Sequence, residues 1–160
     1  MKRIGYIGLG IMGRPMAENL LKADFELFIW NRSHDKTEAL AELGATVCES
    51  PADVAVRSSK VCINVTDTPD VEQVIFGKEG IVEGNPGDTA GLIVIDHSTI
   101  DPGATRDFAK RLADYEIDLL DAPVSGGDTG AKAGTLSIMV GGKRASFDHC
   151  LPVFQAVGKT

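Results

Sequence analysis

The chain has 160 residues, 43% of them hydrophobic and 24% charged, and this ordinary globular composition excludes a disordered, collagen-like or disulfide-stapled protein. The formal net charge of −7 repels phosphate backbones, so we expect no nucleic-acid partner. The apolar runs are too short to cross a bilayer, and the run after Met1 is strand-like rather than a signal-peptide core. We therefore expect a single cytoplasmic domain with no membrane partner.

The three cysteines, Cys48, Cys62 and Cys150, are odd in number and show no C-x-x-C spacing. This pattern argues against a disulfide framework and against a metal site. We expect three reduced and mostly buried thiols.

Short β-rich runs alternate with segments of helical spacing along the whole chain. In the first half the pattern predicts a strand at 2–7, a helix at 12–23, a strand at 25–30, a helix at 35–43 closed by Gly44, a strand at 45–48, a helix from Pro51 to about 58 and a strand at 60–65. In the second half it predicts a helix at 70–76, a loop at 77–91, a strand at 92–96, a helix from Pro102 to about 115 and a strand at 117–122, with 136–140 and 146–157 closing the chain. Because the strands are apolar without alternation, they are typical of a parallel sheet covered on both faces, and the predicted fold class is a doubly wound α/β sandwich of three layers.

A glycine-rich motif, G-x-G-x-x-G, joins the first predicted strand to the first predicted helix and consists of Gly8, Leu9, Gly10, Ile11, Met12 and Gly13. In this position the first glycine permits a tight turn, the second lets the backbone approach a pyrophosphate, and the third lets helix and strand pack closely. The helix N-terminus offers free N–H groups to the phosphates. The motif thus predicts a Rossmann-type dinucleotide site, the alternative being a merely tight turn.

The end of the second strand carries Asn31, Arg32 and Ser33 where an enzyme that uses NAD commonly has a carboxylate for the ribose 2′-hydroxyl. A guanidinium and two small polar side chains suit a 2′-phosphate instead, so we expect NADP, with NAD as the second choice. The alternative is that Arg32 is solvated or stacks on adenine whether or not a phosphate is present.

Further polar residues follow later strands. Val65 and Thr66 are expected beside the cofactor, at the point where the strand order reverses. Thr99 is either a second cofactor contact or a residue before the next helix. The turn after Asp121 contains Ser125, Gly126 and Gly127 and is either a backbone anion site or a turn shaped by proline.

Hydride transfer to a carbonyl also requires a proton donor, and no residue of the chain is a convincing one. His97 lies at the carboxyl end of a predicted strand, the end at which a ligand is expected, but it is more simply a polar residue at a strand end. His34 and His149 have no evident partner, and Lys132 and Lys159 are most simply solvated. We therefore assign no catalytic residue.

Together these residues resemble the β-hydroxyacid dehydrogenase family along the whole chain. The markers are the run 7–13, Asp96-His97-Ser98-Thr99, and the run 121–127 followed by Ala133-Gly134-Thr135-Leu136. The resemblance implies an oxidoreductase of small 3-hydroxyacids and semialdehydes. It implies that a nicotinamide dinucleotide is held by the glycine loop, residues 31–33, Val65, Thr66 and Thr99, and that the substrate carboxylate is held by Ser125, Gly126 and Gly127.

By the same resemblance, the catalytic lysine of the family lies in a glycine-spaced motif at the start of an all-helical second domain. That motif is not found in this sequence. We therefore expect 1–160 to be the dinucleotide-binding domain of a longer enzyme and to be inactive by itself. We expect the full-length enzyme to be a homo-oligomer. The alternative is a non-catalytic module that binds a dinucleotide for sensing or for positioning a partner. A methyltransferase that binds S-adenosylmethionine would need an acidic residue near Asn31, which the sequence lacks.

Overall fold

The computed structural model describes residues 2–84, 89 and 91–160. Its centre is a six-stranded sheet of order β3-β2-β1-β4-β5-β6 in which every neighbouring pair is parallel. The strands are β1 (Arg3–Ile7), β2 (Glu26–Trp30), β3 (Thr46–Val47), β4 (Lys60–Ile63), β5 (Ile93–Asp96) and β6 (Asp118–Asp121). The order reverses between β1 and β4, as it does in a doubly wound fold of the Rossmann type. The predicted fold class is confirmed.

Both faces of the sheet are buried, which explains why the strands lack polar alternation. Ile4 and Tyr6 of β1 belong to one apolar cluster, whereas Ile7 belongs to the cluster on the opposite face. The same division holds in β5, where Ile95 and Val94 point to opposite faces. Successive side chains of a strand alternate in direction, so a strand covered by helices on both sides needs apolar residues at every position.

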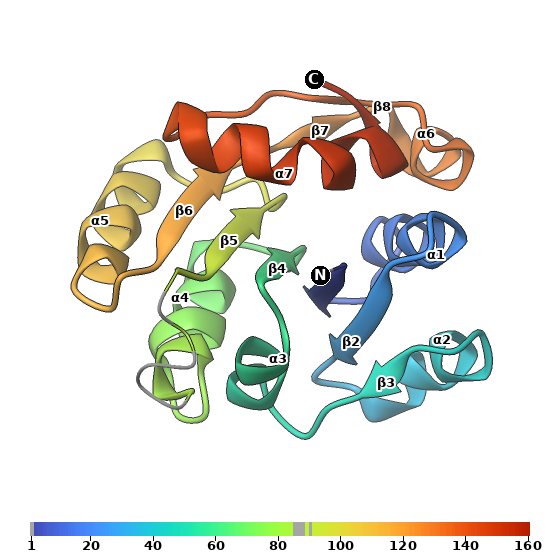
Figure 1. Ribbon diagram of the computed structural model, residues 1–160, viewed down its shortest axis with the longest axis horizontal. Coiled ribbons are helices and arrows are strands. Elements are labelled where there is room, and N and C mark those ends of the chain that lie inside the picture. Colours follow the sequence, from blue (N-terminus) through green and yellow to red (C-terminus); the bar gives the residue numbers. More distant parts are fainter. Residues whose placement is uncertain (1, 85–88, 90) are drawn as a thin grey trace.

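Helices cover the two faces as separate layers (Figure 1). One layer contains α1 (Gly13–Lys22), α2 (Glu38–Glu42) and α7 (Arg144–Val157), whose apolar side chains enter the first cluster. The other contains α3 (Pro51–Arg57), α4 (Thr68–Phe76) and α5 (Pro102–Ala113). The main sheet is therefore the middle layer of a three-layer sandwich.

Several helix ends follow from local sequence chemistry. The Ser50 hydroxyl accepts a hydrogen bond from the Asp53 N–H at 3.0 Å, and the Asp101 carboxylate accepts one from the Ala104 N–H at 2.9 Å. A proline follows each of these caps, where its missing N–H costs nothing. Gly44 ends the helical region with a φ of 108°, a conformation that favours glycine.

A second, three-stranded sheet departs from the regular alternation that the sequence suggests. It consists of β7 (Val124–Ser125), β8 (Leu136–Ile138) and β9 (Gly158–Lys159), with β7 antiparallel to β8 and β9 parallel to it. An additional helix, α6 (Gly127–Ala133), connects β7 to β8 and contacts α1 through the Asn19 amide, which donates to the Ala131 carbonyl at 2.8 Å.

Two further segments differ from the sequence expectation. The helix expected at 35–43 is a 3-10 turn, η1 (His34–Thr37), followed by the five-residue α2. The loop expected at 77–91 contains a 3-10 turn, η2 (Ile81–Glu83), and its residues 85–88 and 90 lie outside the described part of the chain.

Candidate functional site

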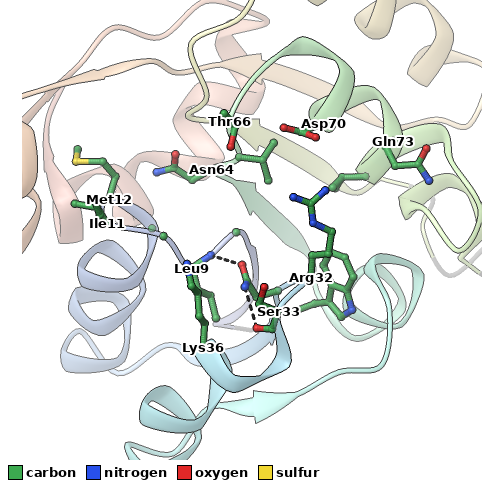
Figure 2. A pocket seen from close by; sticks show the side chains of 17 residues that line it. Leu9, Ile11, Met12, Arg32, Ser33, Lys36, Asn64, Thr66, Asp70 and Gln73 are labelled. Carbon is green, nitrogen blue, oxygen red and sulfur yellow. Dashed lines mark hydrogen bonds between the residues drawn. The ribbon is translucent and has the colours of Figure 1, made fainter.

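A cavity of about 400 Å³ opens at the carboxyl ends of β1, β2 and β4, where the strand order reverses (Figure 2). This is the position at which open α/β sheets bind their ligands. Its lining comes from the glycine loop, the end of β2, the end of β4 and helix α4: Gly8, Leu9, Gly10, Ile11, Met12, Gly13, Trp30, Asn31, Arg32, Ser33, Lys36, Asn64, Val65, Thr66, Asp70, Gln73 and Val74.

The three glycines of the loop have distinct steric surroundings. A Cβ on Gly8 would lie 2.1 Å from the backbone oxygen of Asn64, and the residue has a φ of 96°. A Cβ on Gly13 would lie 2.0 Å from the oxygen of Gly8, because α1 begins against β1. A Cβ on Gly10 would meet no protein atom within 4 Å. Gly8 and Gly13 are therefore required by the fold, whereas Gly10 leaves open space at the cavity.

The backbone of the glycine loop presents unused donors. Among the described residues, the N–H groups of Gly10, Ile11 and Met12 have no acceptor within the chain, whereas the Leu9 N–H donates to the Asn31 side chain. These groups precede the first turn of α1, where the helix dipole favours negative charge. Ile11 is 79% exposed, so its side chain is not packed in the core and the loop is open to solvent at this residue. The loop is thus able to receive an anion such as a phosphate group.

Asn31 joins the end of β2 to the glycine loop. Its side-chain oxygen accepts a hydrogen bond from the Leu9 N–H at 2.9 Å, and its amide donates to the Ser33 carbonyl at 3.0 Å (Figure 2). Both polar atoms of this side chain therefore have partners inside the protein. The sequence suggested Asn31 as a ligand contact beside Arg32, and the structure adds that it holds two lining segments together.

The end of the cavity near β2 is cationic and exposed. Arg32 and Ser33 lie at the end of β2, and Lys36 follows one turn later in η1. Figure 2 shows the Arg32 side chain directed across the cavity, with Asp70 and Gln73 of α4 on the facing wall. The sequence patterns did not indicate Lys36, which stands in η1 three residues after its N-cap, Ser33.

The structure brings together only part of the predicted site. All residues suggested at the glycine loop, at 31–33 and at 65–66 line this cavity. Thr99, Ser125, Gly126 and Gly127 do not line it. Thr99 is exposed after β5. Gly126 and Gly127 have φ values of 137° and 63°, so the turn that leads into α6 depends on glycine.

His97, considered as a proton donor, is buried away from the cavity. The residue is 3% exposed, its Nδ1 lies 2.8 Å from the Ala122 carbonyl, and Phe154 packs against its ring edge to face. Burial lowers the pKa of His97 to about 4, so the ring is neutral near pH 7. Cys48, Cys62 and Cys150 are buried, as the sequence suggested, and burial raises the pKa of each thiol.

The sheet order, the glycine loop and the cavity define a dinucleotide-binding domain of the Rossmann type. The model of the family described as the NAD binding domain of 6-phosphogluconate dehydrogenase matches residues 3–160, and the chain belongs to this family. It is 43% identical over 157 residues to 2-hydroxy-3-oxopropionate reductase of Escherichia coli strain K12, covering 98% of this chain and 52% of that protein.

Two other proteins extend the comparison. The chain is 37% identical over 158 residues to a probable mitochondrial 3-hydroxyisobutyrate dehydrogenase of Dictyostelium discoideum, covering 99% of this chain and 48% of the relative. The solved structure of Psf3 in complex with NADP+ and 2-OPP superimposes with a TM-score of 0.90 at 27% identity, covering 98% of this chain and 55% of that one. The chain thus spans about half the length of the curated relatives it matches. None of the helices in the described residues is long and apolar enough to cross a membrane.

Proposed function

We propose that the cavity binds NADP(H), with NAD(H) as the weaker ligand, and that the chain is the cofactor domain of an oxidoreductase. The substrates of this enzyme are small 3-hydroxyacids or the corresponding semialdehydes. The observation that carries the proposal is the glycine loop, in which Gly10 leaves space beside three backbone N–H groups that have no acceptor among the described residues. When bound, the nicotinamide would supply or accept the hydride.

The pyrophosphate is assigned to the glycine loop. Gly10, Ile11 and Met12 would donate their N–H groups, and the open space at Gly10 would allow the phosphates to approach the backbone. Gly8 and Gly13 would act indirectly, because they permit the turn that aims these donors into the cavity.

The adenosine end is assigned to Arg32, Ser33 and Lys36. A 2′-phosphate placed there would receive a bidentate contact from the guanidinium, a hydrogen bond from the hydroxyl and a second positive charge. Asn31 supports this end by holding Leu9 and Ser33 in place. Stacking of Arg32 on adenine would add affinity for either cofactor and would not discriminate between them.

The nicotinamide end is assigned to Val65, Thr66 and Thr99, and the substrate carboxylate to Ser125, Gly126 and Gly127. Val65 and Thr66 line the cavity, which supports the first of these assignments. The names of the reductase and dehydrogenase relatives support the substrate class. Proton transfer is assigned to the all-helical second domain that the resemblance to β-hydroxyacid dehydrogenases implies.

Binding of the two cofactors tests the proposal without requiring turnover. Calorimetric titration of the folded chain with NADPH and with NADH is expected to show about tenfold tighter binding of NADPH, because a charge-assisted phosphate contact is worth more than 1 kcal/mol. Equal affinities would remove the preference for NADP(H) and leave dinucleotide binding intact. Absence of binding to a chain with native circular dichroism would overturn the proposed function.

A cytoplasmic location and a homo-oligomeric full-length enzyme are further parts of the proposal. The first needs a direct localisation experiment, because two relatives carry the word mitochondrial in their names.

A further inference from the structure

The hydrogen-bond ladder between β4 and β5 ends one residue before the cavity. The last backbone bond of this edge runs from the His97 N–H to the Ile63 carbonyl at 2.8 Å. Beyond it, the Val65 N–H donates to the Ser98 hydroxyl oxygen at 2.9 Å. The Ser98 hydroxyl therefore replaces the backbone carbonyl that would continue the ladder, and it holds Val65, which lines the cavity after β4.

The Ser98 side chain is itself held by a local turn. The Ser98 N–H donates to Oδ1 of Asp96 at 2.9 Å, an arrangement typical of an Asx turn, in which a carboxylate caps the backbone two residues later. Asp96 is 1% and Ser98 is 2% exposed, so water does not compete for the contact between them. One buried and one part-buried hydrogen bond in series thus connect the end of β5 with Val65.

Val65 also contacts the glycine loop. A Cβ on Gly8 would lie 3.0 Å from Cγ1 of Val65, so the backbone of Gly8 packs closely on this side chain. A displacement of Val65 would therefore change both the β4 wall of the cavity and the support beneath the loop.

We infer that Asp96 and Ser98 are positioning residues that hold the Val65 peptide in the conformation competent to bind the dinucleotide. The inference rests on the proposed function, because it concerns the ligand of the same cavity. Without the Ser98 hydroxyl, the segment after β4 samples other conformations. The dinucleotide binds only the competent conformation, so its apparent affinity falls by the same factor as the population of that conformation.

The chain offers a matched control for the loss of a buried serine hydroxyl. Ser146 is 3% exposed, and its hydroxyl donates to Oδ2 of Asp118 at 2.7 Å. It connects α7 with the start of β6, at the end of the sheet opposite to the cavity. Ser98→Ala and Ser146→Ala therefore each remove a part-buried hydrogen bond made by a buried serine, and only the first lies on the path to Val65.

The test combines amide exchange of the free protein with cofactor binding. In Ser98→Ala we expect the Val65 amide to exchange roughly fivefold to tenfold faster, while the neighbouring Asn64 amide, bonded to the Ile7 carbonyl at 2.9 Å, keeps its rate. NADPH binding is expected to weaken by a similar factor. In Ser146→Ala the unfolding midpoint falls to a comparable extent, with the Val65 exchange rate and the NADPH affinity unchanged.

Substitution of Asp96 tests the second step. Asp96→Asn retains an oxygen acceptor for the Ser98 N–H and is expected to bind NADPH within about twofold of the original chain. Asp96→Ala removes that acceptor and is expected to bind as weakly as Ser98→Ala. If Asp96→Ala fails to fold, the two serine variants decide the question by themselves.

The failures are distinguishable. Equal NADPH affinities of Ser98→Ala and Ser146→Ala, or an unchanged Val65 exchange rate in Ser98→Ala, would overturn the positioning role and leave the proposed function standing. If the unsubstituted chain binds neither NADPH nor NADH, the proposed function fails, and the inference built on it fails with it.

Discussion

The carboxyl edge of the main sheet has two halves of opposite character. At the ends of β1, β2 and β4, polar groups face a cavity, and the N–H groups of Gly10, Ile11 and Met12 have no acceptor among the described residues. At the end of β5, the polar side chains of Asp96 and His97 are buried, and α7 packs Phe154 against the His97 ring. The first half leaves the N–H groups of its loop to a ligand, whereas Asp96 and His97 in the other half are enclosed within the protein.

Burial has different consequences in the two halves. In the enclosed half, burial raises the pKa of Asp96 to about 6 and lowers that of His97 to about 4, so each group favours its neutral form. Within the described residues, Oδ2 of Asp96 and Nε2 of His97 are buried without a hydrogen-bond partner. In the open half Arg32 and Lys36 are exposed. The open half is therefore suited to recognise charge, whereas the buried Asp96 and His97 of the enclosed half support the sheet.

The largest effect is expected from a change that breaks the open half sterically. Gly8→Ala would place Cβ 2.1 Å from the Asn64 oxygen at a φ of 96°, and we expect a loss of about 4 kcal/mol in the free energy of unfolding. Gly10→Ala is the control, because its Cβ meets no protein atom within 4 Å and its stability should change by less than about 0.5 kcal/mol. Urea unfolding measures both values.

The same pair separates folding from binding. Gly10→Ala is expected to weaken NADPH binding by at least about tenfold, because the added methyl group occupies the space assigned to the pyrophosphate. A Gly10→Ala variant that binds NADPH as tightly as the original chain would contradict that assignment.

A second prediction concerns the enclosed half, where the two buried groups oppose each other as pH changes. The raised pKa of Asp96 contributes stability that is present below pH 3.8 and is lost as pH rises through about 6. The lowered pKa of His97 contributes stability that is present above pH 6.5 and is lost as pH falls through about 4. Each contribution amounts to about 3 kcal/mol, so between pH 4 and 6 the two nearly cancel.

Single substitutions should reveal each contribution. Relative to the original chain, the unfolding free energy of His97→Asn should decline by about 3 kcal/mol from pH 4 to 6.5, and that of Asp96→Asn should rise by about 3 kcal/mol over the same range. Urea unfolding at four pH values measures these slopes, and groups elsewhere cancel in the comparison. Parallel pH profiles of the three proteins would show that the buried pair does not titrate as described.

A third prediction tests the cationic end of the open half. Arg32→Asp is expected to weaken NADPH binding by about 2 kcal/mol or more and NADH binding by less, because it removes a phosphate contact and adds repulsion. Arg106→Asp makes the same change of charge at an exposed position of α5 and should leave both affinities nearly unchanged. Equal losses for both cofactors in Arg32→Asp would refute the assignment of the 2′-phosphate.

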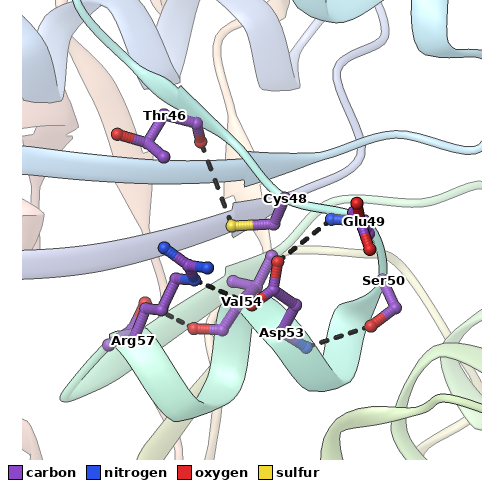
Figure 3. Close-up of polar contacts among 8 residues, drawn as sticks. Thr46, Cys48, Glu49, Ser50, Asp53, Val54 and Arg57 are labelled. Carbon is purple, nitrogen blue, oxygen red and sulfur yellow. Dashed lines mark hydrogen bonds and ion pairs between the residues drawn. The ribbon is translucent and has the colours of Figure 1, made fainter.

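The local polar network at Cys48 illustrates what sequence patterns predict well. Ser50 caps α3, and Asp53 accepts hydrogen bonds from the Glu49 N–H and from Arg57 one turn later (Figure 3). Such contacts join residues three or four positions apart, so the N-cap and the proline after it were predictable. The glycine motif was predictable for the same reason, since its spacing encodes a local turn.

Features that depend on distant partners were not predictable. The strands β7 and β9 have two residues each and form only because β8 lies between them, so they carry no periodic signal. Asp70 and Gln73 reach the cavity because α4 packs on the sheet opposite the end of β2, and nothing in their own segment indicates a ligand. Conversely, Ser125 stands in a specific motif but lies outside the cavity lining, and its assignment to substrate stays a prediction.

The smallest predicted effect concerns Lys36, the cation that the sequence pattern missed. An exposed lysine is a solvated point charge, so its contact with a 2′-phosphate should be worth about 0.5–1 kcal/mol. Lys36→Met is therefore expected to weaken NADPH binding by about threefold at low ionic strength, with NADH binding unchanged. The control Lys110→Met removes an exposed lysine of α5.

Salt distinguishes a charge contact at Lys36 from lost packing. At 0.5 M NaCl the Debye length is only about 4 Å, so the difference between Lys36→Met and the original chain should largely disappear. The bidentate contact assigned to Arg32 is directional as well as ionic, and a larger part of its contribution should persist. If the Lys36→Met deficit is the same at both salt concentrations, the ammonium group does not contact the phosphate, and the preference for NADP(H) rests on Arg32 and Ser33.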